Sequence, residues 1–401
     1  MNDVNAHHTS PAMADLALPA HLRARALVPL LDAHTAEIDR RRELTQEVVD
    51  ALVRQDLLRL LLPRGLGGQE IPLLEFCRTT EAVAIGDAST GWFVNQSNVS
   101  SASSAAAMPP EAAAQVFRGP GDGLAWGSKH NRSVATRVEG GYRLSGTWSY
   151  ASGSRHTTWI GAHSAVTNPD GSPHMRNGVQ DDRSFLFPKS QAEVVDDWQV
   201  LGLRGTGSDT YTVRDLFVPD AFAPARDDPA EKRWHGPLFP IGSTLMYATG
   251  FCGVTMGVAR RMLDTYIELS RVRHSRSSSY AMAANQAVHR EIGLLEAKLS
   301  AARAFLHQAV ADVYDASVRG CLDVDLRVRL RLATTYGMNE ATEVSVACYR
   351  GAGTMAIHDS APFERRLRDA LSASQHLQAM MSHVEMAGRH LIGTGDPPAF
   401  I

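Results

Sequence analysis

The stretch RVEGGYRLSGTWSY, residues 137–150, interrupts an otherwise helical chain and so decides its fold. Polar and apolar residues alternate on both sides of Gly140-Gly141, which is typical of two antiparallel strands joined by a tight turn. Further short segments rich in β-branched and aromatic residues follow it, namely TTWIGAHSAVT, RSFLFP and YTVRDLFVP. We therefore expect an all-β central domain, a small barrel or sandwich, over residues 122–235.

The sequence before this domain is patterned as helices. LTQEVVDALVRQDLLRLLLP, residues 44–63, has apolar residues at helical spacing up to Pro63, and PPEAAAQVF places prolines where a helix begins. Small and polar residues are dense from Gly91 to Ala107, which indicates a helix end or a loop that faces a cavity. These patterns predict an N-terminal helical domain over residues 21–121, after a flexible tail at residues 1–20.

Helices return after the strands. Apolar residues step by four and three between Val288 and Leu306, which is typical of a long bundle helix. Gly250, Gly253 and Gly257 give the preceding helix a smooth face for close approach. We therefore predict a helical bundle over residues 236–401, and a fold that is α+β but mostly α.

Composition excludes several classes of protein. The 401 residues are 44% hydrophobic and 21% charged, as in an ordinary globular protein, and their net charge of −3 offers nothing to nucleic acid or to an anionic membrane. No apolar run approaches the roughly 20 residues that a membrane span needs. The four cysteines lie far apart, so we expect reduced core thiols in a cytoplasmic protein and no metal site.

Motifs for the commonest chemistries are absent from the sequence. It contains no GxGxxG after a strand, no GxxxxGK[ST], no HExxH and no GxSxG. GLRGTG, residues 202–207, is rich in glycine but lacks the phosphate-loop lysine, so we interpret it as a turn of the β-domain. The chemistry therefore requires a bound cofactor.

Three stretches together carry a family resemblance: GGYRLSGTWSYASG, LGLRGTGSDTYTVRDLFVP and YRGAGTMAIHDSAPFERRLRDALSASQH. With the order of helices, strands and helices, they resemble the acyl-CoA dehydrogenase superfamily. They are most similar to its two-component flavin-dependent monooxygenases, such as the oxygenase component of p-hydroxyphenylacetate hydroxylase and dibenzothiophene monooxygenase. The resemblance runs from about residue 25 to the end. It implies that the C-terminal helices form a four-helix bundle and that the protein is a homotetramer, with flavin between the β-domain and the bundle.

The resemblance also implies site residues. The Ser of the W-x-[FY]-x-S-G segment is Ser152, which would lie beside the flavin ring, and Ser128, next to Trp126, would contact the flavin edge. Among the arginines of SRVRHSR (Arg271, Arg273 and Arg276), we expect Arg273 to anchor the flavin. Gly351 and Gly353 belong to RGAGTM, which stands where relatives that hold FAD have G-G-x-G. This departure favours FMN, although FADH₂ is possible.

His376 separates two branches of the superfamily. The dehydrogenase branch needs a carboxylate base, but the position eight residues after Asp369 is Leu377, and no Asp or Glu occurs from Pro237 to Leu263. An imidazole that titrates near neutrality could instead protonate and hold a flavin C4a-(hydro)peroxide. We expect Arg365 and Arg366 to pair with Asp369 along one helix, and His376 to project from nearly the same face.

These expectations define an oxidoreductase: a reduced-flavin-dependent monooxygenase that uses O₂ and receives FMNH₂ from a separate NAD(P)H:flavin reductase. The enzyme would be a hydroxylase whose substrate is a small aromatic or heteroatom-bearing molecule. This substrate would bind in a pocket lined by Asn95, Tyr247 and Phe251. Two alternatives stay open: a flavin dehydrogenase or oxidase of the same fold with bound FAD, and a non-catalytic paralogue.

Overall fold

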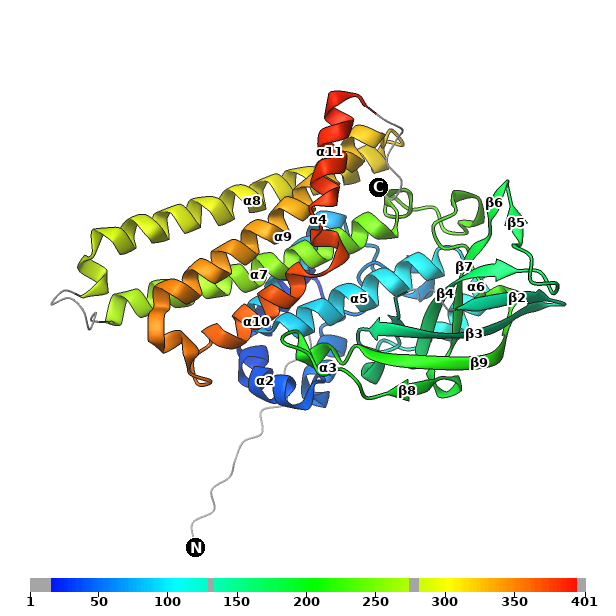
Figure 1. Cartoon of the computed structure of the whole chain (residues 1–401), viewed down its shortest axis with the longest axis horizontal. Coiled ribbons are helices and arrows are strands. Elements are labelled where there is room, and N and C mark those ends of the chain that lie inside the picture. The colour runs from blue at the N-terminus through cyan, green and yellow to red at the C-terminus, as the bar shows by residue number, and fades with distance from the viewer. Residues whose placement is uncertain (1–15, 129–132, 274–280, 395–401) are drawn as a thin grey trace, which may run out of the picture.

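The computed structural model describes residues 16–128, 133–273 and 281–394, and shows helices at both ends of the chain with strands between them (Figure 1). The predicted fold class is confirmed. Most of the predicted N-terminal tail, and Arg276, lie outside the described residues.

In the part of the chain that the structure describes, six α-helices precede the strands: α1 (Ala20–Ala26), α2 (Val28–Arg41), α3 (Gln46–Arg54), α4 (Leu73–Gly86), α5 (Ala88–Ala105) and α6 (Pro110–Val116). The predicted helix up to Pro63 is wrong in its second half, because α3 ends at Arg54 and Asp56 takes a positive φ of 49°. The chain beyond is buried and non-helical, and the amides of Leu60 and Leu61 donate to Oδ1 of Asn98.

The small-residue stretch from Gly91 to Ala107 is mostly one helix, not the helix end or loop that we predicted. Every residue of α5 is buried, from Ala88 to Ala105. Small side chains allow a helix to be packed on all sides, so this composition marks close packing rather than a surface loop. In Figure 1, α5 runs between the bundle and the strands, which gives it access to both.

The strands form a curled seven-stranded sheet and a two-stranded ribbon. The strands are β1 (Leu124–Trp126), β2 (Val134–Val138), β3 (Gly141–Ala151), β4 (Trp159–Thr167), β5 (Met175–Arg176), β6 (Val179–Gln180), β7 (Asp182–Pro188), β8 (Glu193–Val195) and β9 (Asp209–Pro219). The sheet order is β1-β4-β2-β3-β9-β8, with β7 paired to β4, and β5 pairs with β6. The hairpin predicted at Gly140 is the β2–β3 turn, where Gly140 has a φ of 74°.

Among the described residues, five α-helices follow the strands: α7 (Ser243–Val272), α8 (Gln286–Val318), α9 (Val324–Ala352), α10 (Phe363–Ser374) and α11 (Ser382–Ile392). The predicted smooth face lies where α7 meets α4 and α5: Gly250 faces Asn95, Gly253 faces Thr80, and Gly257 faces Glu81. No helix among the described residues is both long enough and apolar enough to cross a membrane. Cys77, Cys252 and Cys348 are buried as expected, whereas Cys321 is exposed.

The charges of α10 attach it to other parts of the chain, and the predicted pairs within the helix are wrong. Arg366 donates to Oδ1 of Asp32 at 2.7 Å, and Arg365 donates to the hydroxyl of Thr35. Both acceptors are on α2. Asp369 accepts a hydrogen bond of 2.6 Å from the amide of Leu203, in the glycine-rich turn before β9. Helix α10 is therefore fixed against α2 and the β-domain, just before His376.

Candidate active site

His376 lies just beyond α10, and not on its face as we predicted. The helix ends at Ser374, and His376 takes an extended backbone conformation at the start of a short 3₁₀ turn, Leu377–Ala379. Its ring lies 4.5 Å from the ring of Phe251 on α7 and 5.2 Å from that of Trp92 on α5, measured between ring centroids. The change of direction at the helix end brings the imidazole to two buried aromatic residues.

The protonation state of His376 follows from its contacts. Nδ1 accepts a hydrogen bond of 3.3 Å from the amide of Gln378, so in the neutral ring the proton is on Nε2. Burial lowers the pKa of His376 to about 4, against our expectation of titration near neutrality. At pH 7 the side chain is thus a neutral donor, and Nε2 has no hydrogen-bond partner among the described residues.

The three predicted pocket residues come together beside His376. Nδ2 of Asn95 donates to the carbonyl of Tyr247 at 3.3 Å, and the Tyr247 ring stacks on Phe251 with centroids 6.0 Å apart. Trp92, which we did not predict, completes this group at 3.9 Å from Phe251. The signal for it was an aromatic pair, Trp92-Phe93, in a stretch made otherwise of small and polar residues.

Ser152 lies at the end of β3, on the side of α5 that faces the β-domain. Its hydroxyl is 2.7 Å from that of Ser208, which is 2.7 Å from that of Thr206, so three hydroxyls form a chain. The next residue, Gly153, has a φ of 80°, and a Cβ there would be 2.5 Å from the Phe93 ring. Only glycine therefore lets the β3 end approach α5 this closely.

Trp126 and Ser128 lie at the end of β1. Trp126 is buried against His163 of β4, with ring centroids 5.2 Å apart. Ser128 is exposed, and its amide donates to the carbonyl of Ser149 at 2.7 Å. A residue that we did not predict, Arg226, lies over the Trp126 ring at 4.4 Å.

Arg273, Gly351 and Gly353 form a separate group at the far end of the bundle. Arg273 follows the last residue of α7 and donates through Nη1 to the carbonyl of Ala352, between the two glycines. It is 22 residues after Phe251, which at the rise of an α-helix is about 33 Å along α7. Within one chain, Arg273 is therefore not brought to the site around His376.

Several buried polar atoms around α5 lack partners, and they bear on whether a flavin fits here. Ser97, Ser101 and Ser104 follow one another at helical spacing, and the hydroxyl of each is buried without a hydrogen bond among the described residues. Oδ1 of Asn95, Oγ1 of Thr157 and the hydroxyl of Tyr247 are in the same condition. A polar heteroaromatic ring such as flavin offers donors and acceptors for such atoms, so these residues fit it.

Comparison with known proteins also points to a flavin-dependent enzyme. Residues 249–381 match the family described as Acyl-CoA dehydrogenase, C-terminal domain. The chain is 29% identical to indole-3-acetate monooxygenase of Pseudomonas putida over 92% of each chain. It is 27% identical to the flavin-dependent monooxygenase, oxygenase subunit HsaA, of Rhodococcus jostii, over 88% of this chain and 93% of that one. The structure of XiaF from Streptomyces sp., in complex with FADH2 and glycerol, superposes with a TM-score of 0.87 at 25% identity, covering 95% of this chain and 96% of XiaF.

Residues 249–381 therefore match the acyl-CoA dehydrogenase C-terminal domain family, and over most of its length the chain is similar to flavin-dependent monooxygenases, as the sequence resemblance implied. The chain is an oxidoreductase of the flavin-dependent monooxygenase class.

Proposed function

We propose that this chain is the oxygenase component of a two-component monooxygenase, which receives reduced flavin from a separate NAD(P)H:flavin reductase and hydroxylates a small aromatic substrate. The observation that carries the proposal is the neutral His376, whose Nε2 proton lies beside Phe251 and Trp92 with no protein acceptor among the described residues. The names of the relatives, a monooxygenase of an indole acid and an oxygenase subunit, support it.

Reduced flavin, when bound, would activate O₂, so that one oxygen atom of O₂ can be transferred to the substrate. The residues that would hold the flavin are the serines of α5 whose buried hydroxyls have no hydrogen-bond partner among the described residues, together with Trp126, Ser128 and Ser152 at the edge of the β-domain. The hydroxyl chain from Ser152 to Thr206 can reorient to donate or to accept a hydrogen bond. Reduced FMN and FADH₂ could both bind here through the flavin ring. A competition experiment between the two would identify the natural cofactor.

His376 would keep a proton at Nε2 available to oxygen chemistry in the space between α5 and α7. The rings of Trp92, Phe251 and Tyr247 would exclude water from that space and hold a planar substrate. No carboxylate is among the contacts of the His376 ring in the described residues, so the site lacks the base that abstraction of a C–H proton requires.

Arg273 would contribute only across a subunit interface, because it lies at the opposite end of α7. We therefore propose a homo-oligomer, in line with the homotetramer that the resemblance implies, in which Arg273, Gly351 and Gly353 of one copy complete the flavin site of another.

The experiment that tests the proposed function is a coupled assay. The protein, FMN or FAD, NADH and a flavin reductase are incubated with indole-3-acetate and other small aromatic compounds under labelled oxygen gas. One labelled oxygen atom in a product, formed only with the protein present, is the expected result. Oxidation of NADH that yields only hydrogen peroxide with every compound would contradict the proposal.

A further inference from the structure

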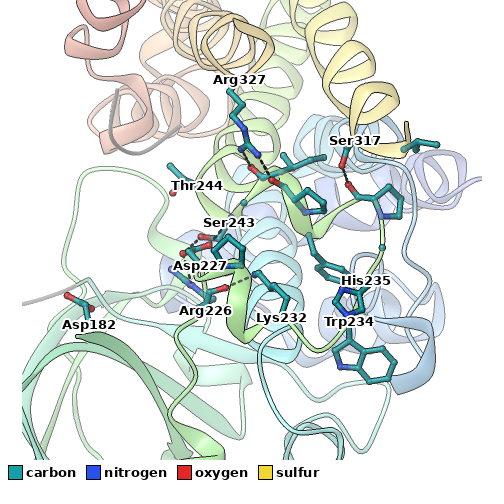
Figure 2. Close-up of a pocket in the computed structure, with 18 of the residues that line it drawn as sticks. Asp182, Arg226, Asp227, Lys232, Trp234, His235, Ser243, Thr244, Ser317 and Arg327 are labelled. Carbon is teal, nitrogen blue, oxygen red and sulfur yellow. Dashed lines mark hydrogen bonds and ion pairs between the residues drawn. The ribbon is translucent and has the colours of Figure 1, made fainter. Parts of the chain in front are cut away.

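A large cavity lies between the sheet and the bundle, beside the start of α7. It has a volume of about 1370 Å³ and is lined by side chains from β4, β7, the segment before α7, and the adjoining ends of α8 and α9. Figure 2 shows Arg226, Asp227 and Ser243 close together, with Ser317 and Arg327 on another part of the wall. Of the charged residues among these, Arg226 is the most buried.

Arg226 is a buried cation with unfilled donors. The residue is 8% exposed, and neither Nε nor Nη1 has a hydrogen-bond partner in the part of the chain that the structure describes. The nearest polar atoms are Oδ2 of Asp227, 3.4 Å from Nε, and Nε2 of His163, 3.4 Å from Nη2. A buried guanidinium is costly unless its donors are satisfied, so this arrangement indicates a missing acceptor.

The neighbouring charges do not supply that acceptor. Asp227 has a half-exposed side chain, and its two oxygens already accept from the amide and the hydroxyl of Ser243 at 3.2 and 2.9 Å. Asp182 is engaged with Nδ1 of His163 at 2.9 Å. Lys232, also on the cavity wall, adds a second positive charge and donates to the carbonyl of Arg226 at 2.6 Å. The wall around Arg226 therefore favours an anion.

A second unpartnered group points to the same ligand. The hydroxyl of Tyr247 is buried next to Ser100 and Arg226, without a well-aligned hydrogen bond to either. Burial raises the pKa of Tyr247, and the nearby Arg226 guanidinium counters part of that rise, so the phenol is a neutral donor next to a cation. The same Tyr247 ring stacks on Phe251, which contacts His376. Tyr247 therefore connects the Arg226 group with the aromatic group around His376.

We propose that Arg226 and the hydroxyl of Tyr247 bind a carboxylate of the substrate, so that the enzyme acts on aromatic acids in preference to their neutral analogues. The claim that aromatic acids are hydroxylated rests on the proposed function, whereas the claim that their carboxylate is bound does not. A guanidinium that stacks on Trp126 presents its donors in one plane, which matches the two oxygens of a carboxylate. The phosphate of a flavin offers similar chemistry, and the test must distinguish the two sources.

The test measures binding by calorimetry, without turnover, for indole-3-acetate, 4-hydroxyphenylacetate and benzoate, each beside its neutral amide. Wild type should bind at least one acid about tenfold or more tightly than its amide, as expected for hydrogen bonds to a charged group. Arg226→Gln should abolish that preference while leaving affinity for the amide and for reduced FMN within about threefold, and Arg226→Lys should restore part of it. Arg327→Gln is the matched control, because Arg327 lines the same cavity but donates to the carbonyls of Ile241 and Pro240.

Three outcomes would overturn the inference. Wild type that binds no acid better than its amide excludes a carboxylate site. An Arg226→Gln variant that loses only reduced FMN assigns the anion to the flavin phosphate. Equal loss of acid and amide in both arginine variants assigns Arg226 a structural role. Hydroxylation of neutral compounds without preference for acids would leave the proposed function standing, whereas selective acid binding without any flavin reaction would remove that function and leave the Arg226 site.

Discussion

At the scale of single residues, the position and protonation of His376 matter most. A histidine on the exposed face of α10 would titrate near neutrality, whereas the turn after Ser374 places the ring against Phe251 and Trp92 and lowers its pKa to about 4. The sequence was sufficient to select this residue through the family resemblance. It was not sufficient to give the protonation state, because burial by Trp92 and Phe251 arises from segments that are far apart in the chain.

His376→Ala should lower the yield of hydroxylated product by about a hundredfold, the range expected when a positioned proton donor is lost. Reduced flavin should still be consumed, with hydrogen peroxide formed in place of product. The measurement is product and peroxide per NADH oxidised. His390→Ala serves as the control, since His390 pairs with Asp325 at a surface position of α11. An unchanged product yield in His376→Ala would remove this residue from the mechanism.

Asp369 gives a pH dependence of stability. Burial and the neighbouring Asp87 raise its pKa to about 7, whereas a carboxyl in an unfolded chain titrates near about 4. Between these values the folded state binds the proton more tightly, so the free energy of unfolding falls as the pH rises from about 4 to 7. Asp369→Asn keeps an acceptor for the Leu203 amide and cannot ionise.

We therefore expect the thermal midpoint of Asp369→Asn, relative to wild type, to increase between pH 5 and pH 8. Differential scanning calorimetry at several pH values would measure it. A difference between the two proteins that does not change with pH would show that Asp369 is ionised across the whole range.

At the scale of elements, the contact between α4 and α7 depends on glycine. A Cβ on Gly253 would lie 2.3 Å from Oγ1 of Thr80 and 2.6 Å from the carbonyl oxygen of Cys77, and a backbone atom cannot move aside cheaply. Gly253→Ala should lower the free energy of unfolding by about 1–3 kcal/mol, as overpacking does. Urea denaturation would measure the change.

Gly293→Ala on α8 is the matched control for that substitution. A Cβ at Gly293 meets no atom within 4 Å, so the variant should gain about 0.5–1 kcal/mol from better helix propensity. Equal effects in the two variants would contradict the close approach of α4 and α7. The sequence predicted this face from glycine spacing alone, because the period of three and four residues is local information.

Other elements could not be predicted in this way. The apolar run up to Pro63 has helical spacing, yet the chain leaves the helix at Arg54 because Asn98, on α5, accepts hydrogen bonds from Leu60 and Leu61. The arginines of α10 likewise pair with Asp32 and Thr35 of α2 rather than with Asp369. Both errors have one cause: partners that are distant in sequence outcompete local pairing.

At the scale of the whole molecule, the two groups of predicted flavin contacts lie at opposite ends of α7, and the bundle carries exposed apolar side chains. Val272, Leu294 and Val318 are 76%, 65% and 61% exposed, and Leu391 and Ile392 are both 76% exposed. These single side chains do not define an interface, and the separation of the two groups of flavin contacts is what predicts a homo-oligomer. We expect analytical ultracentrifugation to give the mass of a homo-oligomer. A monomer at micromolar concentration would contradict a flavin site shared between copies.

The central claim is that this chain uses reduced flavin to activate oxygen. The most direct measurement is anaerobic stopped-flow: the protein is mixed with reduced FMN, then with oxygen, while oxygen consumption and flavin absorbance are followed together. The account predicts that oxygen is consumed first and that the absorbance of oxidised flavin returns after a delay, which lengthens or shortens in His376→Ala. Oxidation of the flavin in step with oxygen consumption, at the rate of free FMN, would contradict it.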